Sequence, residues 1–273
     1  MKKNLLIFII IIALMGIFLY YENNHLTVSP YKFRTDNEDM AGLKIVHITD
    51  LHNKSFGKNQ IKLITLIDSL EPDVVLFTGD IVDARRDGYE NALILMKDLS
   101  SKYPLYRILG NHDYSEDGLY LESLLENEAL ITLKNENDIF YYNDIRVSIR
   151  GIKDPVAYPR RNREEAYLSS IAMGENEDYN ILLAHRPEYF YHYIKEDYNL
   201  VLSGHAHGGQ IRLPFLGGLM APHQGIFPKF DGGLYEEENT KMIVSRGLGN
   251  SLFPFRVFNK PEVVFIEFES QTP

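Results

Sequence analysis

Histidine side chains follow two short apolar runs in the second half of this chain. The run 181–184 leads directly into His185, and the run 200–202 leads into His205 and His207. Apolar runs of this length, bounded by proline and glycine, are typical of buried strands. Ligands of open α/β sheets bind outside the carboxyl ends of the strands. We therefore expect these three imidazoles to meet at one edge of a sheet.

Three earlier apolar runs end in clusters of the same kind. They cover 43–49, 74–78 and 105–109, and the side chains that follow them are Asp50 and His52, then Asp80 and Asp83, then Asn111, His112 and Asp113. Imidazole and carboxylate groups are the nitrogen and oxygen donors that bind divalent metal ions. Five apolar runs ending in such clusters therefore predict a shared metal site.

The segments between these runs indicate which elements position the clusters. Apolar residues recur with a helical period over 60–70, and 91–99 and 117–128 are also expected to be helical. This alternation predicts an α/β fold with a largely parallel sheet and helices on its faces. Further along we expect strands over 139–152 with a turn at 143–144, helices over 163–173 and 187–196, a long loop or loose hairpin over 213–233, and closing strands at 242–245 and 262–268.

Composition narrows the range of functions. The chain has 273 residues, of which 45% are hydrophobic, enough for a sizeable core. Its net charge of −10 argues against nucleic acid as a partner, since that needs a basic surface. A small phosphorylated substrate is compatible with this charge, because bound cations reverse the local sign. The absence of cysteine excludes disulfides and thiolate metal sites.

The amino terminus carries an uncharged apolar run of 17 residues, Leu5 to Tyr21. This length suits a transmembrane helix, and we interpret residues 1–22 as an uncleaved membrane anchor. A cleaved signal peptide is the rival interpretation, but no small-residue cleavage site follows. Lys2 and Lys3 would keep the amino end in the cytoplasm and place the remaining domain outside the cell membrane. Residues 23–41 are interpreted as a polar tether, with an edge strand at 31–34, and residues 42–273 as the domain that carries all of these clusters.

The clusters match a known family in order and spacing. The motifs Asp50-x-His52, Gly79-Asp80-x-x-Asp83, Gly110-Asn111-His112-Asp113, His185 and Gly204-His205-x-His207 resemble the five blocks of the calcineurin-like metallophosphoesterases. The resemblance covers residues 43 to the carboxyl end. It implies a four-layer α-β-β-α sandwich and a hydrolase with two divalent metal ions.

The resemblance also implies a role for each motif residue. Asp50, His52 and His207 would hold one ion, Asn111, His185 and His205 the other, and Asp80 would bridge both. The nitrogen and oxygen donors suit Mn, Zn, Fe, Co or Ni. A bridging hydroxide would attack phosphorus while His112 assists the leaving group, and Asp113 would orient the His112 ring. Asp83 is expected to support the site similarly, although Asp83 and Asp113 also fit as ordinary helix N-caps.

The strings Gly204–Gln210 and Ser245–Asn250 resemble the membrane-associated bacterial branch of the family, in which some members act on UDP-diacylglucosamine. This similarity predicts hydrolysis of phosphodiester or pyrophosphate bonds in a phosphorylated small molecule or a lipid-linked substrate. A general phosphomonoesterase and a non-catalytic metal-binding scaffold are the alternatives. The resemblance implies no particular oligomeric state.

Several other residues have two interpretations. Arg85, Arg86, Arg160, Arg161, Arg163 and Arg186 either contact phosphate or form solvated surface. The histidines outside the motifs, which are His25, His47, His192 and His223, are expected to be structural. The apolar segment 214–220 either enters the membrane, holds an acyl chain, or packs under the closing strands.

Overall fold

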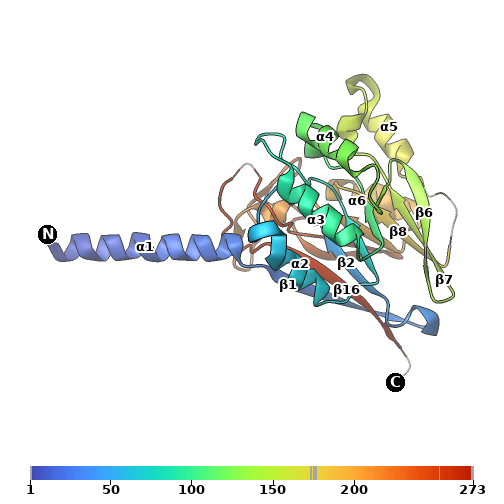
Figure 1. Cartoon of the computed structure of the whole chain (residues 1–273), viewed down its shortest axis with the longest axis horizontal. Coiled ribbons are helices and arrows are strands. Elements are labelled where there is room, and N and C mark those ends of the chain that lie inside the picture. Colours follow the sequence, from blue (N-terminus) through green and yellow to red (C-terminus); the bar gives the residue numbers. More distant parts are fainter. Residues whose placement is uncertain (1, 173, 175–176, 252, 272–273) are drawn as a thin grey trace.

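The first of two six-stranded sheets contains both ends of the folded chain (Figure 1). The computed structural model describes residues 2–172, 174, 177–251 and 253–271. The sheet has the order β1-β16-β2-β3-β4-β5, with β1 at Thr27–Thr35, β16 at Glu262–Ser270, β2 at Lys44–Ile48, β3 at Val74–Phe77, β4 at Leu105–Arg107 and β5 at Ile131–Thr132. The strands β2 to β5 are parallel, as the alternating pattern predicts.

The second sheet is also mixed. Its order is β14-β15-β9-β8-β7-β6, with β14 at Gly233–Glu237, β15 at Thr240–Val244, β9 at Leu200–Ser203, β8 at Tyr179–Leu183, β7 at Ile145–Gly151 and β6 at Glu136–Tyr142. The four central strands are parallel, and antiparallel pairs close both edges. The predicted turn at 143–144 joins β6 to β7.

Apolar side chains fill the space between the two sheets. Successive strand residues point to opposite faces, so Ile45 faces the second sheet while Val46 faces the helices. Ile45 shares its cluster with Leu183 and Leu202 from the other sheet. Burial on both faces explains why the central strands are almost continuously apolar.

Helices cover the outer face of each sheet. The helices α2 at Ile61–Asp68, α3 at Glu90–Ser100 and α4 at Glu116–Leu125 pack on the first sheet through residues such as Leu63, Leu95 and Leu121. The helix α5 at Arg163–Ser170 and the short α6 at Phe190–Tyr193 pack on the second sheet through Tyr167 and Tyr193. The 3₁₀ turns Pro187–Tyr189 and Ile194–Glu196 flank α6, so the predicted helix over 187–196 is helical but irregular. Residue 173, the end of the helix predicted over 163–173, lies outside the described residues.

The segment 213–233 contains short hairpins, as predicted. The strand β10 at Arg212–Leu213 pairs with β11 at Gly217–Gly218, and β12 at Met220–Ala221 pairs with β13 at Gly225–Ile226. Phe215 and Leu216 form the tip of the first hairpin and are exposed, so the interpretation that they pack under the closing strands is wrong.

The helix α1 at Lys2–Asn24 projects away from the folded body (Figure 1). The part Lys3–Asn24 has a mean hydropathy of 2.5 in its most apolar window, none of which is buried. The next segment is not irregular as predicted: β1 runs parallel to β16 in register from Thr27 to Thr35, well beyond the expected edge strand at 31–34. The β-branched and aromatic residues of β1 explain this pairing, because they favour a pleated, half-buried surface.

Candidate metal centre

The strand ends of both sheets meet at one place and bring the motif residues together. Asp50 and His52 follow β2, Asp80 follows β3 and Asn111 follows β4, whereas His185 follows β8, and His205 and His207 follow β9. The carboxylates and imidazoles among them form groups in which potential ligand atoms lie within 4.8 Å of one another, and Asn111 lines the same cavity as Asp80. The prediction that these strand ends share one site is therefore confirmed.

One group consists of Asp50, His52, Asp80 and His207. The Nε2 atoms of His52 and His207 are 3.1 Å apart. The Oδ1 atom of Asp50 lies 3.5 Å from Nε2 of His207, and Oδ2 of Asp80 lies 3.9 Å from Nε2 of His52. Two imidazole nitrogens and two carboxylate oxygens thus surround a common point.

A second group consists of Asp80, His185 and His205. The Nε2 atom of His185 lies 3.2 Å from the same Oδ2 of Asp80 and 3.1 Å from Nδ1 of His205. The Nδ1 atom of His185 is 2.8 Å from the carbonyl oxygen of Thr78. A carbonyl only accepts hydrogen bonds, so Nδ1 carries the proton and Nε2 is left free as a ligand.

The Oδ1 atom of Asn111 is buried without a hydrogen-bond partner among the described residues. Buried polar atoms normally have partners, and an ion bound by this oxygen explains the exception. Nε2 of His52 faces Nε2 of His207, and Nδ1 of His205 faces Nε2 of His185, as expected of nitrogens that share an ion. The donor set therefore fits divalent metal ions.

Burial shifts the pKa values of the site strongly. It lowers the pKa of His52 to about 4 and holds those of His205 and His207 well below the usual range, so these rings are neutral, as metal ligands must be. Burial raises the pKa of Asp50 to about 7. Burial opposes protonation of His185, but the Asp80 carboxylate raises its pKa to about 10. Without a cation, the carboxylates thus recruit a proton to His185.

The backbone of the ligand loops is held in an uncommon conformation. Five of the candidate ligands have φ between 48° and 65°, namely Asp50, His52, Asp80, His205 and His207. Such left-handed conformations are unfavourable for residues with side chains and cluster at functional sites. Glycine permits the close packing of these loops: a Cβ on Gly204 would lie 2.5 Å from Oδ2 of Asp50, and one on Gly110 would lie 2.3 Å from Oδ1 of Asp80.

His112 lies beside the metal ligands, and its ring centroid is 4.7 Å from that of His52. Its Nδ1 atom is 3.1 Å from Oδ1 of Asp83, and its Nε2 atom is 3.1 Å from a guanidinium nitrogen of Arg85. Burial works against protonation of His112, but the hydrogen bond that the protonated ring donates to Asp83 and the charge of Asp80 raise its pKa. The backbone nitrogen of Ala84 lies 2.9 Å from the same Nδ1 atom, so the ring is oriented by Asp83 together with this backbone group.

The predicted role of Asp113 in orienting His112 needs correction. Both carboxylate oxygens of Asp113 accept hydrogen bonds from backbone N–H groups, which belong to Asp80, Ile81, Val82 and Gly110 at 2.7 to 3.2 Å. Asp113 therefore fixes the loop that carries Asp80, and Asp83 is the carboxylate at the His112 ring. Neither residue is a helix N-cap.

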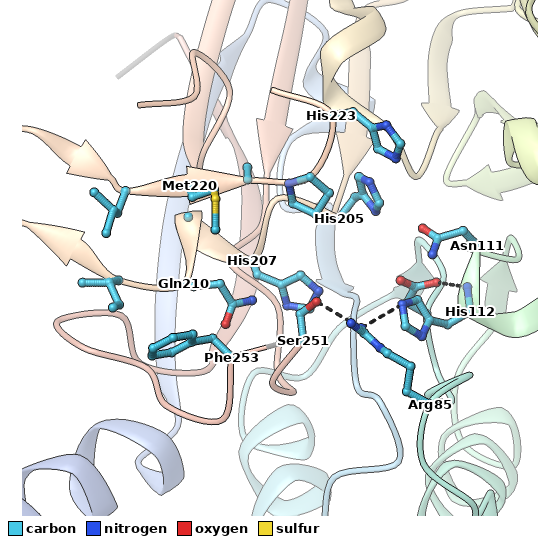
Figure 2. Close-up of a pocket in the computed structure, with 16 residues that line it drawn as sticks. Arg85, Asn111, His112, His205, His207, Gln210, Met220, His223, Ser251 and Phe253 are labelled. Carbon is cyan, nitrogen blue, oxygen red and sulfur yellow. Dashed lines mark hydrogen bonds between the residues drawn. The ribbon is translucent and has the colours of Figure 1, made fainter. Parts of the chain in front are cut away.

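The candidate arginines differ in their position relative to the metal centre. Arg85 lines the cavity at the centre, between His112 and Ser251 (Figure 2). Arg186 is buried and bound to both carboxylate oxygens of Asp154, so neither interpretation offered for it, a phosphate contact or a solvated surface, applies. The sequence Arg160-Arg161-x-Arg163 lines a separate surface hollow with residues of α5.

Among the histidines outside the motifs, His223 was expected to be structural, but it lines the cavity and stacks on His205 with 5.5 Å between ring centroids. Its position in a loop far along the sequence gives no periodic signal that could have revealed this. His47 is buried, with Nε2 2.8 Å from the hydroxyl of Thr78, which fits the structural role expected for it.

A cavity of about 410 Å³ opens over this centre. Its polar lining includes Asp80, and Figure 2 shows Arg85, Asn111 and His112 on one side, with Met220 and Phe253 on the other. The apolar residues that line the cavity are Ile211, Leu219, Met220, Ala221, Pro222 and Phe253. The cavity thus offers one wall to a charged group and another to an apolar one.

Comparison with known proteins agrees with this geometry. The family model described as calcineurin-like phosphoesterase matches residues 43–209. The chain is 30% identical over 236 residues to the uncharacterized metallophosphoesterase YkuE of Bacillus subtilis, covering 84% of this chain and 80% of the relative. It is 33% identical over 231 residues to YkoQ of the same organism, covering 82% of each chain.

A vertebrate relative has a similar identity. The transmembrane protein with metallophosphoesterase domain of Danio rerio is 28% identical over 246 residues, covering 84% of this chain and 54% of the relative. Taken with the family match, these similarities show that the chain belongs to the calcineurin-like phosphoesterases. It is a metallophosphoesterase, a hydrolase with a candidate binuclear metal site.

Proposed function

We propose that this protein is a membrane-anchored, two-metal hydrolase of phosphodiester or pyrophosphate bonds. The observation that carries the proposal is the position of Oδ2 of Asp80, which belongs to both ligand groups. One ion would be held by Asp50, His52 and His207, and the other by Asn111, His185 and His205, with Asp80 between them. The three clusters of apolar side chains, one between the sheets and one under each set of helices, support the four-layer α-β-β-α arrangement.

The donor set suits Mn, Zn, Fe, Co or Ni. When bound, a pair of such ions supplies Lewis acidity toward the phosphoryl oxygens and activates a water molecule as a nucleophile. The protein residues supply the rest. Arg85 is placed to pair with a phosphoryl oxygen, because its guanidinium lines the cavity next to His112.

His112 supplies the proton that hydrolysis requires. Hydrolysis breaks one P–O bond and adds water across it, so the departing oxygen must take up a proton. The Asp83 carboxylate faces Nδ1 of His112, and Nε2 accepts from the Arg85 guanidinium, which can only donate. Once Arg85 pairs with a phosphoryl oxygen instead, Nε2 is free to carry the proton and donate it to the leaving group. The oxygen of the attacking water stays on phosphorus and its proton passes to solvent. The His112 ring takes up a new proton from solvent.

The anchor supports an extracytoplasmic substrate. The exposed apolar helix α1 is long enough to cross a bilayer, and one relative is described as a transmembrane protein. With Lys2 and Lys3 on the cytoplasmic side, the catalytic domain lies outside the cell membrane, away from cytosolic phosphoproteins. We therefore favour a phosphorylated small molecule or a lipid-linked phosphodiester or pyrophosphate as the substrate, as in the membrane-associated branch that the sequence resembles.

The test uses the full chain in detergent, stripped of metal and resupplied with Mn, Zn, Fe, Co or Ni in turn. We expect cleavage of bis-p-nitrophenyl phosphate to exceed cleavage of p-nitrophenyl phosphate and to depend on metal. Asp80→Asn should abolish cleavage and reduce the bound metal, whereas Asp144→Asn, in the exposed turn between β6 and β7, should change neither.

Each other outcome selects an alternative. A preference for the monoester would identify a phosphomonoesterase. Two bound metal ions without cleavage of either ester would favour the non-catalytic scaffold. Cleavage that survives in Asp80→Asn would refute the assignment of Asp80 as the shared ligand.

A further inference from the structure

Two apolar segments beside the cavity are exposed. One comprises Phe215 and Leu216 at the tip of the first hairpin together with Ile226 and Phe227 at the end of β13, and the other is a loop with Phe253, Phe255 and Phe258. We call these seven residues the apolar rim. The two segments are joined, because Ile211 pairs with Val257 and the N–H of Arg212 donates to the carbonyl oxygen of Val257. Contiguous exposed apolar residues of this kind mark protein or membrane contacts.

The space inside this loop is filled by another side chain, so the phenylalanine side chains of the loop point outward. Arg256 lies among them in sequence, yet its side chain is buried. Its guanidinium donates hydrogen bonds to the carbonyl oxygens of Arg246, Gly249 and Asn259. The neighbouring Phe255 therefore has no inward position available and keeps 45% of its surface exposed.

The same loop is bound to the end of α1. The side-chain oxygen of Asn23 accepts hydrogen bonds from the N–H of Arg256 and from the side chain of Asn250, and a carboxylate oxygen of Glu22 accepts from the N–H of Asn259. Lys54 donates to the carbonyl oxygen of Asn23. Asn259 in turn donates to the carbonyl oxygen of His207. The end of the helix is thus hydrogen-bonded to a loop that in turn contacts the backbone of the candidate ligand His207.

The contact between Phe18 and Phe258 determines how deep the apolar rim would lie in a bilayer spanned by α1. Their ring centroids are 5.3 Å apart. Phe18 belongs to the uncharged run of α1, and its position is about 9 Å before the helix end at 1.5 Å per residue. If this run lies in a bilayer, Phe18 is at the boundary between hydrocarbon and headgroups, and Phe258 is at the same depth.

We propose that the apolar rim inserts into the headgroup layer of the bilayer that α1 spans, so that the cavity opens at the membrane surface. The proposal rests on the anchor that is part of the proposed function. Phe253 belongs to the rim and also lines the cavity, opposite Arg85 and His112 (Figure 2). A substrate in the membrane plane would then reach the metal centre with its phosphate, while its apolar part stays against the rim.

Fluorescence quenching tests the depth directly, because the chain contains no tryptophan. The full chain carrying Phe255→Trp is reconstituted into phosphatidylcholine vesicles with brominated acyl chains, which quench nearby indoles. Leu14→Trp, within α1, is the positive control. Tyr141→Trp is the negative control, since Tyr141 is exposed on β6, in the second sheet.

We expect loss of fluorescence for Leu14→Trp and Phe255→Trp but not for Tyr141→Trp. Quenching of Leu14→Trp alone would overturn the proposal and leave the anchor intact. Absence of quenching in all three variants would overturn both the proposal and the anchor. Neither outcome depends on catalysis, so a failure of the proposed activity is seen separately.

Activity provides a second readout. Hydrolysis by Phe255→Asp and by the control Tyr141→Asp is measured in phosphatidylcholine vesicles without bromine. One substrate is soluble bis-p-nitrophenyl phosphate, and the other is a chromogenic phosphodiester embedded in the bilayer through a long alkyl chain. We expect Phe255→Asp to lose about tenfold on the embedded ester alone, which corresponds to about 1.4 kcal/mol. Equal losses on both esters, or no loss on either, would overturn the proposal.

Discussion

The Oδ1 atom of Asp83 lies 3.1 Å from Nδ1 of His112, although the residues are far apart in sequence and belong to loops after different strands. This contact fixes the orientation of an imidazole that is not among the expected metal ligands. The site therefore contains two groups of residues. One group comprises the candidate metal ligands, and the other positions the His112 ring.

Asp83→Asn should therefore impair turnover without removing metal. The amide keeps the shape of the carboxylate but loses its charge, so His112 is less well oriented and less readily protonated. We expect kcat to fall about 10- to 100-fold, the range typical of a supporting carboxylate. Metal content, measured by mass spectrometry of the purified protein, should match that of the wild type. A parallel loss of metal would contradict the separation.

His112→Ala provides the matched comparison for this prediction. It should also retain metal, and its turnover should fall more for alkyl leaving groups than for p-nitrophenolate, which departs without protonation. A uniform loss across leaving groups would argue against proton donation by His112.

Asp113→Asn should have the opposite signature. The Asp113 carboxylate accepts four backbone hydrogen bonds from the loop around Asp80 and from Gly110, and an amide nitrogen in place of one oxygen would face donors without an acceptor. Leaving such donors unpaired costs about 1 to 3 kcal/mol. We expect lower metal content, lower activity and a reduced midpoint of thermal unfolding together. Normal metal content with reduced kcat would restore a direct role at the His112 ring.

Gly204→Ala should displace a metal ligand by steric contact. The new Cβ would lie 2.2 Å from Oγ1 of Thr49 and 2.5 Å from Oδ2 of Asp50, both inside van der Waals contact. We expect at least about tenfold weaker metal binding, because Asp50 must move. The control is Gly16→Ala in α1, where no atom lies within 4 Å of the new Cβ and the backbone is not left-handed, and its metal titration should match that of the wild type. Equal titrations for both variants would contradict the packing described here.

His47 should make the fold sensitive to acid. Burial lowers the pKa of His47 to about 3, whereas an unfolded histidine titrates near 6.5. Below about pH 6.5 the unfolded chain binds a proton that the folded chain does not, so stability is full above this pH and is lost as pH falls toward 3. Between about pH 5.5 and 4.5 we expect the free energy of unfolding to fall about 1 kcal/mol more in the wild type than in His47→Gln.

Urea unfolding of the metal-free full chain in detergent measures this difference. His25→Gln, which changes an exposed ring, should retain the pH dependence of the wild type. If His47→Gln retains it as well, the buried ring does not control acid stability.

The sequence alone determined the central strands and the residues that lie at their ends. Central strands are buried on both faces and are therefore continuously apolar, so β2, β3, β4, β8 and β9 could be predicted together with the ligands that follow them. Local sequence also shows the apolar run of α1. These features depend on residues that are adjacent in the sequence, so the sequence pattern is enough to predict them.

Only the tertiary structure decided which residues act as partners. Asp83 rather than Asp113 faces His112, Arg186 is bound to Asp154, and His223 stacks on His205, because contacts between loops depend on how the two sheets pack. The segment predicted as a tether became β1 because β16, more than 200 residues later, offers it an edge. Likewise, the contact of Phe18 with Phe258 joins the two ends of the chain, and no local pattern encodes it.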